Sequence, residues 1–147
     1  MEKTQALPAP PPGFIRRLND TSGAVLVETA LTLPVLAMLM MGMLSYGTWF
    51  MAAHGIQQAA NEGARAAVGG IDDSDRASLV QDAVNSAIAT ANAIRANEVT
   101  TTEVRNGQYY TVTVVYAPAR PMWSSFGLVP TPARQIQRQA TIRLNSL

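Results

Sequence analysis

The longest run of apolar positions in the chain extends from Thr29 to Ala53 and contains no charged residue. A helix of these 25 residues spans about 37 Å, which is enough to cross a hydrocarbon core about 30 Å thick. The apolar core of a secretory signal is shorter, about 7–15 residues. We therefore predict a membrane-spanning helix. Pro34 lies near its start, where proline can kink a helix or leave one carbonyl for a neighbour to satisfy.

Glu28 stands immediately before this run, and spacing alone leaves three interpretations of the segment open. The segment is a cleaved secretory signal, a plain membrane anchor, or a stretch that a peptidase cuts and a partner then binds. In an anchor, Glu28 would reach out to interfacial water. In the third case it would meet a partner, because a carboxylate within a spanning segment is costly and is by default a candidate functional residue.

The helix is expected to continue past the membrane, since the stretch from His54 to Gly69 contains no proline. Small residues recur there at every fourth position, and we call them the small-residue ridge: Gly55, Ala59, Gly63 and Ala67. This spacing allows another helix to approach closely. Alternatively, alanine is present only as a good helix former. The two glycines argue against that alternative, because glycine costs a helix about 1 kcal/mol relative to alanine.

A second helix is predicted from about Ser74 to Ala96, after the glycines and acids of 69–75. Its apolar residues form two adjacent rows suited to packing on a sheet: Leu79, Ala83, Ala87 and Ala91, then Val80, Val84 and Ile88. Asp72, Asp73 and Asp75 fit a helix start, where the helix dipole favours acids. The cluster lacks the glycine and distal glutamate of a calcium loop.

Strands follow on both sides of Asn106-Gly107, a dipeptide that favours a tight hairpin. Four alternating residues share the apolar face of the second strand: Tyr110, Val112, Val114 and Tyr116. A third strand is expected near Arg134 to Leu144, with Arg138 on the apolar side at a sheet edge. The apolar side chains of the connection, Met122, Trp123, Phe126, Leu128 and Val129, either cap the core or touch a partner or the membrane. The expected fold is α+β and membrane-anchored, with the second helix packed on an antiparallel sheet of about three strands.

Charge and composition narrow the function classes. The chain has 147 residues, a net charge of +1, no cysteine and one histidine, His54. This balance argues against nucleic-acid binding, and the residue types give no clustered catalytic, metal or cofactor site. We therefore expect no enzyme, no cofactor and no small-molecule substrate, and we interpret His54 as an interfacial polar residue.

Basic residues indicate the orientation in the membrane. Arg16 and Arg17 precede the apolar run, and the first basic residue after it is Arg65. The positive-inside bias places the N-terminus in the cytoplasm and the C-terminal domain outside. The predicted division is a cytoplasmic leader at 1–23, a transmembrane helix with an extramembrane extension at 24–69, and an extracytoplasmic α+β domain at 70–147.

One spacing suggests a family. Gly23 precedes Ala24, Glu28 is the fifth residue after that glycine, Pro34 follows six residues later, and 59–65 reads A-A-N-E-G-A-R. Over about residues 21–70 the chain resembles the TadE-like pseudopilins, or minor pilins, of the tight-adherence (Tad, or Flp) pilus machinery. It departs from common patterns at Thr29, where many members have an aromatic residue, and in its long, proline-rich leader.

The resemblance implies that a prepilin peptidase cuts after Gly23 and creates a cationic amine at Ala24. It also implies that Glu28 meets the corresponding amine of a neighbouring subunit. Assembly would then involve Glu28, Pro34 and the small-residue ridge. The implied partners are the bacterial inner membrane, the peptidase, other pilin or pseudopilin subunits, and the Tad assembly platform. The alternative is an uncleaved single-pass scaffold protein of an envelope secretion complex. A membrane-tethered enzyme is a third class, but it would need a clustered catalytic site, and the sequence contains none.

Overall fold

The computed structural model describes residues 21–92, 94–121 and 130–144. It contains a first helix α1 (Thr21–Ala66) with a short 3-10 turn η2 (Ala67–Gly69), and a second helix α2 (Asp73–Thr90). The turn η3 (Ala96–Glu98) leads into three strands, β1 (Val99–Asn106), β2 (Tyr109–Tyr116) and β3 (Ile136–Arg143). The chain divides into two compact units, Met1–Leu39 and Met40–Leu147, which are described separately.

The described part of the first unit is helical throughout, and its side chains from Gly23 to Leu39 are exposed. Pro34 lies within the helix and cannot donate a backbone hydrogen bond. Thr29 Oγ1 donates to the carbonyl of Val25 at 2.8 Å, which satisfies this hydroxyl within the helix. Exposed apolar side chains around a whole helix suit a lipid surrounding. By length and hydropathy, the described residues contain one helix that could span a membrane, Gly23–Gly69.

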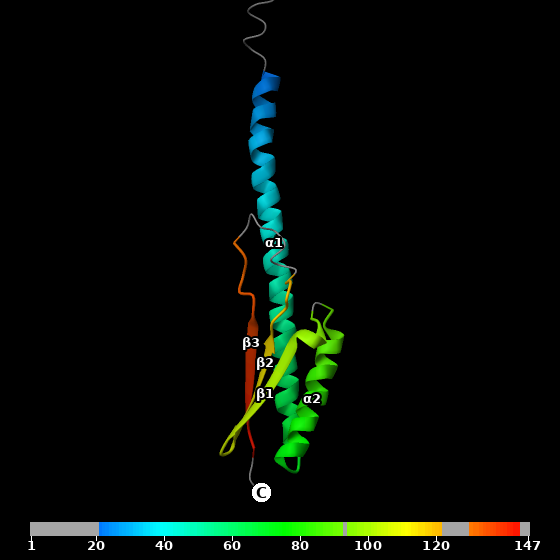
Figure 1. Cartoon of the computed structure of the whole chain (residues 1–147). Coiled ribbons are helices and arrows are strands. Elements are labelled where there is room, and N and C mark those ends of the chain that lie inside the picture. Colours follow the sequence, from blue (N-terminus) through cyan, green and yellow to red (C-terminus); the bar gives the residue numbers. More distant parts are fainter. Residues whose placement is uncertain (1–20, 93, 122–129, 145–147) are drawn as a thin grey trace, which may run out of the picture. The chain divides into compact units, whose positions relative to one another are not determined.

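In the second unit, β1, β2 and β3 form an antiparallel sheet with β2 in the centre. The part of α1 that belongs to this unit and α2 lie on one face of the sheet (Figure 1), so inward and outward positions alternate along β2. Its inward side chains are all buried: Tyr110, Val112, Val114 and Tyr116. The expected α+β fold, with a second helix and an antiparallel sheet of three strands, is confirmed.

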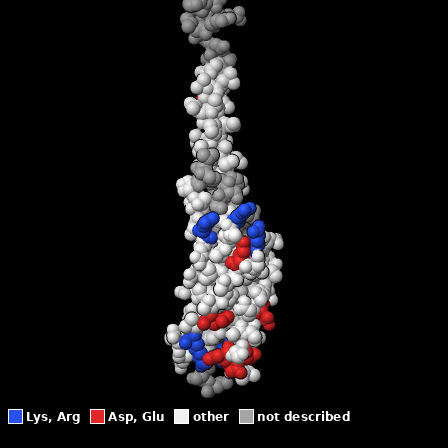
Figure 2. All heavy atoms as spheres, in the orientation of Figure 1, with Lys and Arg blue, Asp and Glu red and all other residues white. Residues whose placement is uncertain are grey.

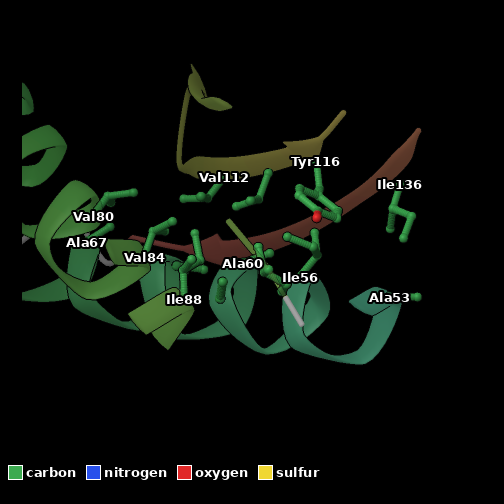
Figure 3. Close-up of a cluster of buried hydrophobic side chains, with 14 of the residues drawn as sticks. Ala53, Ile56, Ala60, Ala67, Val80, Val84, Ile88, Val112, Tyr116 and Ile136 are labelled. Carbon is green, nitrogen blue, oxygen red and sulfur yellow. The ribbon is translucent and has the colours of Figure 1, made fainter. Parts of the chain in front are cut away.

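The core of this unit lies between the helices and β2 (Figure 3). Val80, Val84 and Ile88 of α2 are buried, as the predicted apolar row requires. From α1, Ile56 is the largest fully buried side chain, Trp49 packs partly buried against the core, and the other buried positions are small residues. Ile136 begins β3 in the same core. Arg138 lies partly buried on the edge strand β3, at the place predicted for it.

Two boundaries differ from the sequence expectation. The second helix ends at Thr90, not near Ala96. The chain leaves it early because Ile94 packs over Gly55 of α1 and the backbone must then turn back into β1.

The hairpin turn also lies one residue later than Asn106-Gly107. Asn106 pairs with Tyr109, and the turn residues are Gly107 and Gln108. Gly107 has a φ of 58°, and no described non-glycine residue has a positive φ. This pattern fits a type II′ turn. The observed register sets Val99 opposite Tyr116, whereas a turn at Asn106-Gly107 would set polar Asn97 there.

The loop prediction cannot be compared with the fold. Met122, Trp123, Phe126, Leu128 and Val129 lie outside the described residues. Their assignment to the core or to a contact surface stays a prediction.

Candidate processing and assembly site

The predicted processing residues lie at the start of α1 and are open to their surroundings. Gly23 is two residues inside the helix, and a side chain added there would meet no atom within 4 Å. Ala24 and Glu28 are exposed. Glu28 lies one helical turn after Ala24, and residues four apart share a helix face. A new amine at Ala24 would therefore form on the face that carries the carboxylate.

Pro34 is exposed on the same region of α1. Within the part of the chain that the structure describes, no side-chain hydrogen bond or ion pair involves Glu28. The geometry at Gly23, Ala24, Glu28 and Pro34 therefore consists of exposed positions on an apolar helix. Any partner for the carboxylate must come from outside these residues.

The small-residue ridge lies in the second unit and has a different environment. A side chain at Gly63 would place its Cβ 2.8 Å from Val84 Cγ2, 3.3 Å from Val80 Cγ1 and 3.4 Å from Val112 Cγ1. At Gly55 the corresponding distance to Ile94 Cδ1 is 2.8 Å. The close helix approach predicted from the ridge is confirmed, and the helix that approaches is α2 of the same chain.

The two alanines of the ridge, Ala59 and Ala67, have no exposed surface. Packing within the chain therefore covers the ridge. These residues can act in subunit assembly by holding α2 and the sheet on α1, while a direct contact to another subunit would have to use other surfaces. The sequence pattern specified close packing but carried no information on which helix supplies it.

The acidic cluster caps α2. Asp72 Oδ1 accepts a hydrogen bond from the Asp75 backbone N–H at 2.8 Å, and Asp75 Oδ2 accepts one from the Ile71 N–H at 3.0 Å. These bonds satisfy backbone donors that have no partner inside a helix. Asp73 also lies 2.7 Å from Arg105 Nη1, which ties the start of α2 to the hairpin end of β1. The interpretation as a helix start is confirmed.

Within the described ranges no group of three acidic or histidine side chains could hold a metal ion.

A further feature escaped the sequence analysis. The uncharged run appears uniform to Ala53, yet Ser45 is only 1% exposed and Ala52 is fully buried. Within the unit Met40–Leu147, one side of α1 is therefore covered from Ser45 onward, while Tyr46, Phe50 and Met51 remain exposed. The small side chains of Ala52 and Ala53 were the available signal, because close packing on a helix favours small residues.

Comparison with known proteins finds a family resemblance in the segment that forms most of α1. The model of the family described as TadE-like protein matches residues 23–65. The match begins at the predicted processing glycine and ends in the last turn of α1, so the resemblance seen in the sequence is confirmed for this segment. Searches of curated proteins and of solved structures found no match.

Proposed function

We propose that this chain is a TadE-like minor pilin, anchored in the membrane through α1, that takes part in assembling a Tad-type pilus. In this proposal a prepilin peptidase on the cytoplasmic side removes residues 1–23. The domain formed by α2 and the sheet then lies outside the cytoplasmic membrane, where it faces other pilin subunits and the assembly platform. The observation that carries the proposal is Gly23 followed by Glu28 at the exposed start of an apolar helix, within the segment that the TadE-like family model matches.

The chemistry of assembly follows from the exposed part of α1. Before assembly, its apolar side chains contact lipid. In a filament, they would contact other apolar helices. Glu28 is costly in lipid when unpaired, and an amine at Ala24 of a neighbouring subunit would offset this cost. The carboxylate would thus favour one axial position of a subunit over others, since sliding the helix would leave a charge without its partner.

A second candidate uses the same fold without processing. In an envelope secretion complex, the uncut chain would act as a single-pass scaffold, with Glu28 at the membrane interface. The exposure of Glu28 is compatible with this role, so cleavage is the property that separates the two candidates.

The test is to determine the N-terminal residue of a C-terminally tagged chain, isolated from membranes with and without the prepilin peptidase. We expect Ala24 at the N-terminus when the peptidase is present and Met1 when it is absent. Gly23→Leu should block the cut, and Gly47→Leu is the matched control, because both glycines have open space around them. Intact Met1 in both membranes would refute processing.

Glu28→Ala extends the test from processing to assembly. If the proposal holds, the variant inserts into the membrane normally but fails to support piliation. Normal piliation with this variant would favour the scaffold role.

A further inference from the structure

Basic side chains gather at one end of the sheet in the unit from Met40 to Leu147. The strand register places the start of β1, the end of β2 and the start of β3 together there, since Val99 pairs with Tyr116 and Tyr116 pairs with Ile136. Four arginines flank this end, which we call the basic end: Arg95, Arg120, Arg134 and Arg138. In Figure 2 one group of basic side chains lies at one end of this unit, and most acidic side chains lie towards the other end, where further basic side chains are mixed with them.

The charge balance differs between the basic end and the rest of the unit. Residues 40–147 carry eight arginines and seven acidic residues. The basic end has four of the arginines and only Glu98 of the acids, a net charge of 4 − 1 = +3. The remainder has four arginines and six acids, a net charge of 4 − 6 = −2. The unit therefore presents a positive field at one end, although its total charge is close to zero.

Glu98 pairs with only one of these four arginines, Arg95. Its side chain is 13% exposed, and its Oε1 lies 3.7 Å from Arg95 Nη1 and accepts a hydrogen bond from the Ala119 N–H at 3.2 Å. Among the described residues, no carboxylate lies within ion-pair distance of Arg120, Arg134 or Arg138. Arg120 and Arg134 are exposed, and Arg138 is partly buried with its Nη1 donating to the Gln137 carbonyl at 2.9 Å, so no described carboxylate neutralises the charge of any of the three.

An apolar helix surface adjoins the basic end. Gly55 of α1 lies against Ala91 and Ile94, the residues that lead towards β1, so the preceding turns of α1 are at this end of the sheet. These turns carry exposed apolar side chains: Met43, Tyr46, Phe50 and Met51, between 49% and 73% exposed. Exposed aromatic and aliphatic side chains beside arginines are typical of a membrane–water interface.

In a chain anchored through α1, Tyr46 to Met51 mark where the helix leaves the lipid, because exposed aromatic side chains gather at a membrane–water interface and these turns also contain the buried Ser45 and lead into the buried Ala52. The turns and the basic end belong to the same unit, Met40–Leu147, so the basic end lies at the level of the lipid head groups. Arginine binds phosphate through two parallel hydrogen bonds, so anionic phospholipid is the complementary partner.

We propose that the basic end docks on anionic phospholipid head groups and fixes the outer domain against the membrane before assembly. This proposal rests on the membrane anchoring in the proposed function, but it does not require cleavage after Gly23. Each arginine near an anionic surface contributes about 1 kcal/mol, which is a factor of about five in the ratio of docked to undocked domain.

The test uses the full chain in nanodiscs, either of phosphatidylcholine alone or of phosphatidylcholine with phosphatidylglycerol. The chain has no cysteine, so a fluorophore can be attached to a single introduced one. Gln135→Cys reports on the basic end and Asn106→Cys on the hairpin end, and both positions are exposed. The measurement is quenching of the fluorophore by lipids that carry a nitroxide on the head group.

We expect strong quenching at position 135 in discs with phosphatidylglycerol and weak quenching at position 106. About 1 M salt should reduce the signal at 135, because it shortens the Debye length to about 3 Å. The double variant Arg134→Gln/Arg138→Gln should lower the ratio of docked to undocked domain about 25-fold. The matched control is Arg65→Gln/Arg143→Gln, which removes the same charge away from the basic end and should leave the ratio unchanged.

Quenching at position 135 that is equal in both lipid compositions, or insensitive to salt, would overturn the docking proposal. An equal loss in the control variant would also overturn it, and the salt series needs no variant at all. The outcome is separable from the proposed function, since docking is measured on the uncut chain and processing is measured by the N-terminal residue.

Discussion

The two parts of α1 show how one helix can be built for two surroundings. From Ala24 to Leu44 its apolar side chains are mostly large and exposed, as with Leu26 at 70% and Leu33 at 65%. From Ala52 to Ala67 the buried positions are almost all alanine or glycine, with Ile56 as the large exception. Large side chains on every face suit lipid, while small side chains on one face allow another helix and a sheet to approach. Apolar character alone therefore does not tell the two parts apart, whereas side-chain size does.

The largest effect should come from removing a large side chain from the packed part. Ile56 is fully buried, so Ile56→Ala removes apolar burial and leaves a cavity, at a cost of about 2–5 kcal/mol. Leu36→Ala is the matched change in the exposed part and should alter the stability of the domain by less than about 0.5 kcal/mol. The measurement is urea-dependent proteolysis of the detergent-solubilised chain. Equal destabilisation by both variants would show that the two parts of α1 do not differ in this way.

A smaller effect should come from adding one methyl group to α1. Gly63→Ala places a carbon 2.8 Å from Val84 Cγ2, and overpacking of this kind costs about 1–3 kcal/mol. The higher helix propensity of alanine offsets about 1 kcal/mol of this cost. We therefore expect the free energy of unfolding to fall by up to about 2 kcal/mol. Gly47→Ala has open space and should keep or slightly raise the melting temperature. An unchanged melting temperature for Gly63→Ala would mean that α1 and α2 can separate at little cost.

The smallest effect comes from the ionisation of two buried tyrosines, which belong only to the packed part. It is absent at neutral pH and appears only at alkaline pH. Burial raises the pKa of Tyr110, and the charges of Glu103 and Asp73 raise it further while that of Arg76 lowers it. Burial also raises the pKa of Tyr116, followed by the charge of Glu98. Above about pH 10 these tyrosines ionise in the unfolded chain before they ionise in the folded one.

The free energy of unfolding should therefore be fully retained below about pH 10 and fall as the pH rises above it. Tyr110→Phe should weaken this alkaline loss, because it removes one of the two ionisable groups. The measurement is thermal unfolding of the domain across alkaline pH, with helix content of the exposed part of α1 expected to stay constant. A domain stability that is independent of pH above 10 would contradict the assignment.

Local patterns in the sequence predicted most of the elements. The uncharged run specified a long helix, the row of Val80, Val84 and Ile88 specified the buried face of α2, and the alternation along β2 specified its inward side. The acids at 72–75 marked a helix start, because capping is decided within a few residues. The order glycine, then a fifth-position glutamate, then an apolar helix was also visible without a structure, and the family model matches the segment that contains it.

Long-range packing decided the rest. The end of α2 at Thr90 depends on where Ile94 meets α1, and the hairpin register depends on Val99 facing Tyr116 across the sheet. The partner of the small-residue ridge could not be known from spacing, because a close approach by α2 and by a second subunit require the same small side chains. The basic end could not be seen either, since Arg95, Arg120, Arg134 and Arg138 are separated in sequence and meet only because the antiparallel register brings three strand ends together. The sequence by itself thus determined which segments are helix, strand and candidate membrane span, and the tertiary structure alone decided which surfaces remain free, because burial depends on residues far apart in the chain.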